Sequence, residues 1–183
     1  MAEPREYVGQ FSNPYRVVQI SGTPDATPDY TAGDVLFRNA DGEAFFIPCA
    51  TLGKEQLADL VYIVVREVAV GGAVVKANIK LHFSRVGGVD WAVPAANAAF
   101  SAPADMEDYL GSVDIVTADY EEVQVGGAIG YAIARVPVTE DIRCLLMSAE
   151  SDTGFYAVPA IFGALLAYPV GSDTTIQFFF RQH

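Results

Sequence analysis

Alternating apolar and polar residues predict an all-β fold, an antiparallel β-sandwich or barrel. The pattern is clearest in residues 75–84 (VKANIKLHFS) and residues 174–182 (TTIQFFFRQ). A period of two is typical of an antiparallel strand with one face in the core and the other in water. Turns rich in glycine, such as Gly126-Gly127, separate the segments, and no long helical period interrupts them.

A series of short β-rich segments runs along the chain. They are residues 15–21, 34–38, 44–48, 60–70, 75–84, 113–116, 121–125, 129–138, 142–148, 155–160 and 174–182. Strands at this spacing, with turn residues between them, are typical of a sandwich or barrel. In the segment 75–84, His82 shares one side with Lys76, Asn78 and Lys80, and we interpret that side as solvent-exposed.

Residues 97–115 (NAAFSAPADMEDYLGSVDI) predict a short helical turn that joins two strands. Ser101 can cap the start of the turn, acidic residues there complement the helix dipole, and Gly111 can end it. The acidic residues are Asp105, Glu107 and Asp108, and the apolar face at helical spacing consists of Met106, Tyr109 and Leu110. The segment lacks calcium-loop spacing, so we interpret it as a connection. Residues 51–62 are the other place where a short helix is expected.

The first 29 residues predict an extended arm in front of a sandwich domain at residues 30–183. Prolines recur among polar residues in residues 1–29, which favours an extended chain. We expect the arm either to pack on its own sandwich or to cross to a neighbouring molecule. Three aromatic residues of the arm and one of the last strand are candidate partner-binding residues: Tyr7, Phe11, Tyr15 and Phe179. Packing within the chain is the alternative for all four, since apolar residues mostly fill cores.

Composition indicates a folded protein that avoids polyanions. The net charge is −12, from 23 acidic and 11 basic residues. Phosphate backbones and anionic membranes repel such a chain, so we expect neither nucleic acid nor membrane as a partner. The start of the chain lacks the pattern of a Sec-type signal peptide, and Cys49 and Cys144 lie in apolar runs typical of free buried cysteines. We therefore expect synthesis and folding in a cytoplasm.

The sequence has few residues suited to catalysis or metal binding. Its histidines are His82 and His183, and His82 lies in a predicted strand without the shaped turn that a nucleophile–histidine site needs. The histidines and cysteines show no metal-ligand spacing, and the glycine pairs lack a phosphate-binding pattern. We therefore expect no catalytic residue, no cofactor and no metal, and a protein that is not an enzyme.

Five segments, taken together, carry a further pattern. In chain order they are residues 30–37 (YTAGDVLF), 68–84 (VAVGGAVVKANIKLHFS), 97–115, 143–148 (RCLLMS) and 155–182 (FYAVPAIFGALLAYPVGSDTTIQFFFRQ). The set resembles a family of small structural proteins of tailed phages, the capsid-associated decoration or cement proteins. The sequence departs from that family at Ala96, where the family often has Asp, and in a longer segment between the first two motifs.

The resemblance implies a jelly-roll-like sandwich without catalytic residues. It also implies a place on the capsid surface of a virion, with the major capsid protein as partner. Separately, the exposed edge strands of a sandwich can pair edge to edge, so we expect a homo-oligomer. Two other functions stay open. A tail-fibre, baseplate or carbohydrate-binding module would need exposed aromatic residues, and Trp91 near Asn97 is the one hint of these. A small hydrolase would use two loop carboxylates, for which Asp105 and Asp108 are the candidates.

Overall fold

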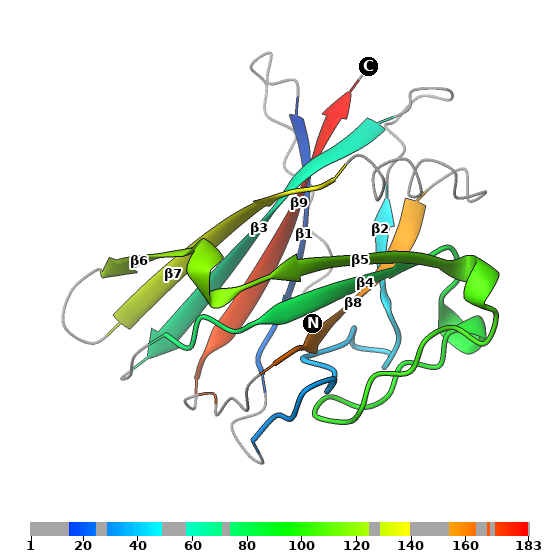
Figure 1. Cartoon of the computed structure of the whole chain (residues 1–183), viewed down its shortest axis with the longest axis horizontal. Coiled ribbons are helices and arrows are strands. Elements are labelled where there is room, and N and C mark those ends of the chain that lie inside the picture. The colour runs from blue at the N-terminus through cyan, green and yellow to red at the C-terminus, as the bar shows by residue number, and fades with distance from the viewer. Residues whose placement is uncertain are drawn as a thin grey trace.

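The computed structural model of the chain consists of two antiparallel β-sheets. It describes residues 15–24, 29–48, 58–70, 74–124, 129–139, 154–163, 168 and 171–182. The large sheet has the strand order β1 (Tyr15–Gly22), β9 (Asp173–Gln182), β3 (Ala58–Val70), β7 (Ile129–Pro137) and β6 (Tyr120–Gln124). The small sheet has the order β2 (Phe45–Pro48), β8 (Gly154–Ile161), β4 (Ile79–Ser84) and β5 (Tyr109–Ile115). Figure 1 shows β6 and β7 at one end of the molecule and β2 at the other.

The strand order is that of a jelly roll. If β6 is left out and the other eight strands are numbered along the chain, the large sheet reads 1-8-3-6 and the small sheet reads 2-7-4-5. In this eight-strand numbering, strand 1 pairs with 8, 2 with 7, 3 with 6 and 4 with 5. These are the pairs that form when one long antiparallel hairpin wraps around a barrel. The all-β, jelly-roll-like sandwich predicted from the sequence is therefore confirmed.

The main core lies between the two sheets. Phe83 and Phe155 of the small sheet face Phe178 and Phe180 of the large sheet, and all four are fully buried. The rings of Phe155 and Phe178 meet edge to face at 6.3 Å between centroids. Aromatic residues bury large apolar areas, and this geometry favours their quadrupoles, so this cluster joins the sheets.

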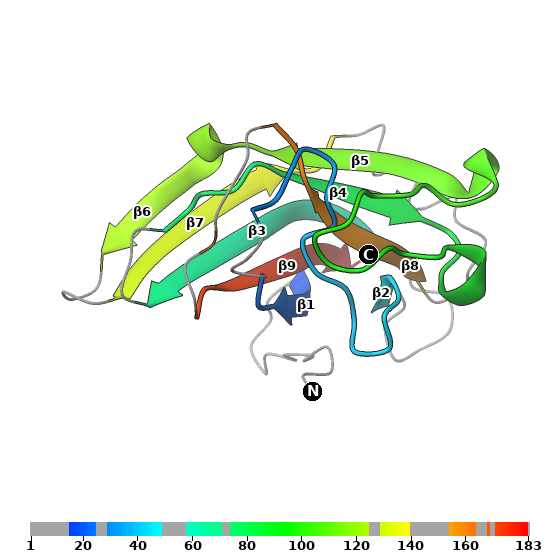
Figure 2. The ribbon, with the colours of Figure 1, turned by 90° about the horizontal axis from the view of Figure 1, so that it is seen from below.

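A second apolar layer covers the other face of the small sheet. Trp91 and Val93 from the segment between β4 and β5 pack here with Val35, Ala44 and Val158. The covering segments lie beside β8 in Figures 1 and 2. The predicted solvent-exposed side of residues 75–84 is therefore wrong for His82 and Ser84, which are buried, whereas Lys76, Asn78 and Lys80 stay partly exposed. Alternation within a strand does not show which distant segments cover it. The strand is also shorter than predicted, since residues 74–78 are irregular and β4 begins at Ile79.

The helical turn within residues 97–115 is shorter than predicted, and a residue other than Ser101 caps it. One 3₁₀ turn, η2 (Met106–Asp108), precedes β5, and the Asp105 side chain caps it by accepting a hydrogen bond from the Glu107 amide at 2.9 Å. Ser101 is not the cap. Met106 is 64 % exposed, so it does not pack on the core as expected, whereas Leu110 is buried in β5. The other short turns are η1 (Gly88–Asp90) and η3 (Thr117–Asp119).

Part of the predicted arm belongs to the large sheet. Residues 15–22 form the edge strand β1, which pairs along its whole length with β9. This part of the arm packs on its own sandwich, one of the two arrangements expected. Several predictions lie outside the described residues: the first part of the arm (1–14), most of the helix at 51–62, the strand at 142–148, and the surroundings of Cys49, Cys144 and His183. Residues 58–62 of the expected helix belong to β3.

Candidate functional site

The most unusual polar residue of the described chain is Glu67, a carboxylate on the inner face of β3. Ile63, Val65 and Ala69 lie on the same face and are buried, and Glu67 itself is only 2 % exposed. A buried carboxylate is costly unless hydrogen bonds replace its water. Two backbone amides supply such bonds: the Lys76 amide donates to Oε2 at 2.6 Å, and the Ala77 amide donates to Oε1 at 3.0 Å.

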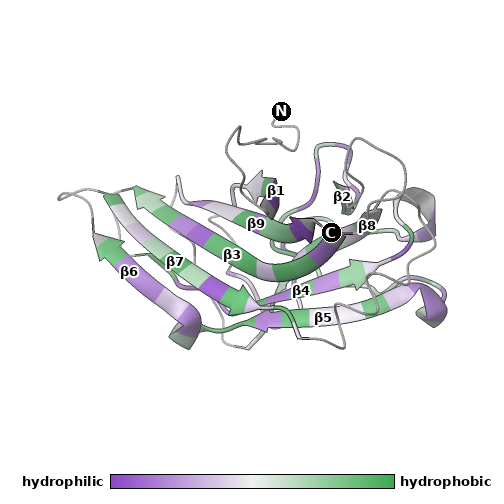
Figure 3. Ribbon diagram, turned by 90° about the horizontal axis from the view of Figure 1, so that it is seen from above, coloured by the Kyte–Doolittle hydropathy of each residue, from purple (hydrophilic) through white to green (hydrophobic). Residues whose placement is uncertain are grey.

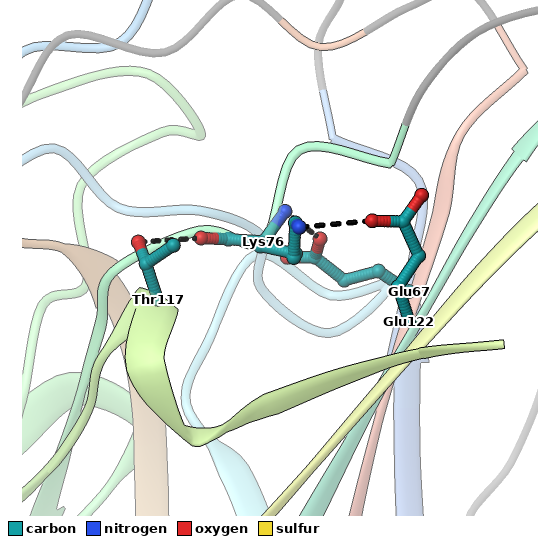
Figure 4. Close-up of polar contacts among 4 residues, drawn as sticks. All are labelled: Glu67, Lys76, Thr117 and Glu122. Atoms are coloured by element: carbon teal, nitrogen blue, oxygen red, sulfur yellow. Dashed lines mark hydrogen bonds and ion pairs between the residues drawn. The ribbon is translucent and has the colours of Figure 1, made fainter.

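The backbone around Lys76 is shaped to bind this carboxylate. Lys76 has a φ of 54°, in the left-handed region that non-glycine residues rarely adopt. Successive amides in such a bend form a concave anion-binding site, and here the anion is the side chain of Glu67. Lys76 makes two further contacts (Figure 4): on the side away from Glu67, Thr117 Oγ1 donates to its carbonyl at 3.0 Å, and its Nζ pairs with Glu122 at 2.9 Å.

Two tyrosine hydroxyls complete the surroundings of Glu67. Tyr120 of β6 and Tyr168 each donate to Oε1 at 3.4 Å. Burial raises the pKa of Glu67, and the amide and tyrosine hydrogen bonds offset part of that rise. Burial and the nearby Glu67 charge raise the pKa of both tyrosines well above the usual value. The cluster thus joins β3, β6, η3 and the 74–78 segment, and its groups point at one another.

Sequence reasoning missed this cluster, although one signal was present. Residues 60–70 (LVYIVVREVAV) predict a strand, and Glu67 has the same parity as the inward-facing Ile63 and Val65. An acid at an inward position of an apolar strand needs hydrogen-bond donors. Which residues supply them, 9 to 101 positions away in sequence, is a matter of tertiary structure.

His82 is the second buried titratable group, and the prediction that it is exposed is wrong. It is 8 % exposed, because Phe100 of the covering segment stacks on its ring at 3.7 Å between centroids and 10° between planes. A hydrogen bond joins its Nδ1 and the Tyr109 hydroxyl at 2.8 Å. Burial lowers the pKa of His82 to about 4, with a further lowering by Lys80 and a small opposing effect of Asp114. The imidazole is therefore neutral at pH 7 and packs as an aromatic residue.

The four candidate partner-binding residues are not brought into one site by the described chain. Tyr7 and Phe11 lie outside the described residues, and Tyr15 begins β1, opposite Arg181 of β9. Phe179 lies half-buried on the outer face of the large sheet and stacks on Tyr62 at 4.3 Å. This contact within the chain uses one face of the Phe179 ring and leaves part of the residue accessible.

The structure also places the residues behind the two other functions, Trp91, Asp105 and Asp108. Trp91 is buried, and its indole Nε1 donates to the Ser101 carbonyl at 2.8 Å, so its ring is not a platform for a sugar. The Asp105 carboxylate caps η2, whose other members are Met106, Glu107 and Asp108. Among the described residues, no group of three or more His, Cys, Asp or Glu residues could hold a metal ion.

Parts of the segments 30–37, 97–115 and 155–182 meet at the small sheet. Residues 33–36 form backbone hydrogen bonds with residues 159–161 of β8 on one side and with residues 97–100 on the other, at 2.6 to 2.9 Å. Isolated bridges link Val35 to Ala160 and Asp34 to Ala99. The stacking of Phe100 on His82 adds the 68–84 segment to the same assembly. Segments far apart in sequence therefore form one structural unit.

No family model matches the sequence, and no curated protein or solved structure gives a significant match. In the part of the chain that the structure describes, no helix is long and apolar enough to cross a membrane.

Proposed function

We propose that this protein is a non-enzymatic structural protein of a tailed-phage virion, which binds the capsid shell and stabilises it as a decoration or cement protein. The observation that carries the proposal is the meeting of residues 33–36 and 97–100 with residues 159–161 of β8, beside the small sheet of a jelly roll. These residues belong to the segments that resemble the decoration proteins. Because these residues hydrogen-bond to one another, the short motifs would share one structural role: they build one sheet and its covering layer.

Two further features support the proposal without depending on the resemblance. The polar clusters around Glu67 and His82 are closed on themselves, so they stabilise the sandwich rather than face a substrate. A rigid, well-packed sandwich suits a protein that holds a fixed position on a lattice. On such a lattice, many weak and identical contacts act together, so the contact that each copy makes with the major capsid protein can be small.

The surface proposed to meet the shell is the β1 side of the large sheet. Val17 of β1, Phe179 of β9 and Tyr62 of β3 lie side by side on its outer face, and the guanidinium of Arg135 lies 5.4 Å from the Tyr62 ring. Aromatic and arginine residues are enriched at protein interfaces, and Tyr15 begins the strand at this edge. This assignment keeps Tyr15 and Phe179 as partner-binding residues.

Immunogold electron microscopy of virions, with an antibody against the purified protein, tests the proposal. Regular labelling over the head is expected. Labelling confined to the tail tip would favour a tail-fibre or baseplate module instead, and unlabelled virions that also lack the protein by mass spectrometry would contradict both placements.

A second measurement tests the surface. Purified heads that lack the protein should bind the wild type in a co-sedimentation assay, and Phe179→Ala should weaken that binding. Met106→Ala is the matched control, because Met106 is an exposed apolar residue of η2, away from the large sheet. Equal binding of Phe179→Ala and the wild type would contradict the proposed surface.

A further inference from the structure

The β6 side of the large sheet carries an exposed apolar patch on its outer face. Val70, Val123 and Ile129 are 55 %, 43 % and 37 % exposed and make up three of the four exposed large apolar residues of the described chain. Figure 3 shows apolar residues at the adjacent ends of β3, β7 and β6. Such patches are typical of interaction surfaces, because isolated exposed apolar residues are common and clustered ones are not.

The strand register shows that the patch is continuous. Val70 pairs with Ile129 across β3 and β7, and Tyr131 of β7 pairs with Val68 on one side and Val123 on the other. Paired residues of neighbouring strands lie on the same face, a few ångströms apart. We call these five residues, with Ile133 of β7, the β7 patch; Val68, Tyr131 and Ile133 are half-buried.

Two charges flank the β7 patch in a symmetric arrangement. Ile133 pairs with Arg66 of β3 on one side and with Glu121 of β6 on the other. Arg66 and Glu121 are both exposed, and neither has an ion-pair or side-chain hydrogen-bond partner among the described residues. The central strand β7 thus has a basic residue on one side and an acidic residue at the same height on the other.

We propose that the β7 patch binds the same patch of a second copy of this chain, with a twofold axis along β7. Rotation about that axis places β3 of one copy over β6 of the other. Arg66 then faces Glu121 of the other copy, this pair occurs twice, and Val68 faces Val123. A twofold interface requires such self-complementarity, because the same surface serves both sides.

The charge of the chain limits which surfaces can associate with themselves. With a net charge of −12, two copies repel each other in most orientations. The patch with its two flanking residues has no net charge, since Arg66 balances Glu121. Packed sheets lie about 10 Å apart, a gap that an arginine and a glutamate side chain can bridge together.

Charge-reversal variants of Arg66 and Glu121 test the proposed dimer, with the oligomeric state of the full chain measured by analytical ultracentrifugation. The wild type should sediment as a dimer, and Arg66→Glu and Glu121→Arg should each weaken dimerisation at least about a hundredfold, because each creates two like-charge contacts. The double variant Arg66→Glu/Glu121→Arg restores both pairs with exchanged signs. Its dissociation constant should return to within about tenfold of the wild-type value.

Matched controls separate this surface from the others. Ile129→Glu should abolish the dimer, whereas Met106→Glu and Glu107→Arg, which change exposed residues of η2, should leave it intact. If β6 edges paired instead, Arg66 would lie two strands from the contact, and Arg66→Glu would have no effect. A monomeric wild type, a dimer insensitive to both reversals, or a double variant that stays monomeric would overturn the proposal. It concerns the purified protein alone and does not rest on the proposed function.

Discussion

Acidification from pH 8 to pH 5 should destabilise the protein by about 2 kcal/mol through His82 alone. The pKa of this histidine is 6.5 in an unfolded chain and about 4 in the folded protein. Between these values the unfolded chain binds the proton more readily, so acid favours unfolding. Linkage then gives a loss of about 2 kcal/mol at pH 5 and about 3 kcal/mol below pH 4, at about 1.4 kcal/mol for each pKa unit.

The physical cause is the covering layer over the small sheet. Phe100 stacks on the imidazole, and Lys80 lies nearby, paired with Asp114 at 2.7 Å. A charged imidazole would lose its water there without gaining an anion of its own. The stability that His82 contributes as a neutral ring is therefore present above its unfolded pKa and lost as the pH falls through the folded pKa.

Urea denaturation at pH 8, 7, 6 and 5 measures this loss when the wild type is compared with His82→Phe. The phenylalanine keeps the stacking on Phe100 but cannot titrate. The loss of the Tyr109 hydrogen bond costs about 1 kcal/mol at every pH, so it cancels in the pH dependence. The difference between the two proteins should change by about 2 kcal/mol from pH 8 to pH 5. Parallel stability curves, or an NMR titration of His82 with a midpoint above pH 6, would refute the reasoning.

Three comparisons of stability test other parts of the structure by urea denaturation at pH 7. Glu67→Ala leaves two backbone amides in the protein interior without acceptors and should lower the free energy of unfolding by about 3 kcal/mol or more. Glu122→Ala, which removes an exposed ion pair, should lower it by less than about 1 kcal/mol. Equal losses would contradict the role of Glu67 as a buried hydrogen-bond acceptor. Asn97 has a φ of 59°, so Asn97→Val should be less stable than Asn97→Gly by about 1 kcal/mol or more, and the reverse order would argue against this backbone. Gly154→Ala would place a Cβ against the Ile47 carbonyl oxygen and should cost about 2 kcal/mol; a variant as stable as the wild type would show that β2 and β8 do not approach so closely.

Several strands could be predicted because their determinants are local. The predicted segments 129–138 and 174–182 agree closely with β7 (Ile129–Pro137) and β9 (Asp173–Gln182). In β9 the buried Ile176, Phe178 and Phe180 alternate with more polar or more exposed residues, so the two faces differ in the sequence itself, whereas β7 could be predicted from its β-prone residues and the turn signals on either side. The residue preferences of turns act over only a few positions, so the spacing of the segments could also be predicted.

The candidate site depended on contacts between distant segments. His82 has the alternation of an exposed strand residue, and it is buried because Phe100, 18 positions later, folds over it. Glu67 is satisfied by amides and hydroxyls that the sequence does not place near it. The symmetric arrangement of Arg66 and Glu121 about β7 depends on the register of three strands, which local patterns leave undetermined.

The sequence by itself determined that this protein is built from antiparallel strands with a largely acidic surface, because strand periodicity and charge are properties of neighbouring residues. Only the tertiary structure decided which strand faces are covered, where the buried carboxylate and imidazole lie, and which apolar face stays open. The reason is that burial is a property of pairs of segments: a side chain is exposed or buried according to what the rest of the chain lays over it.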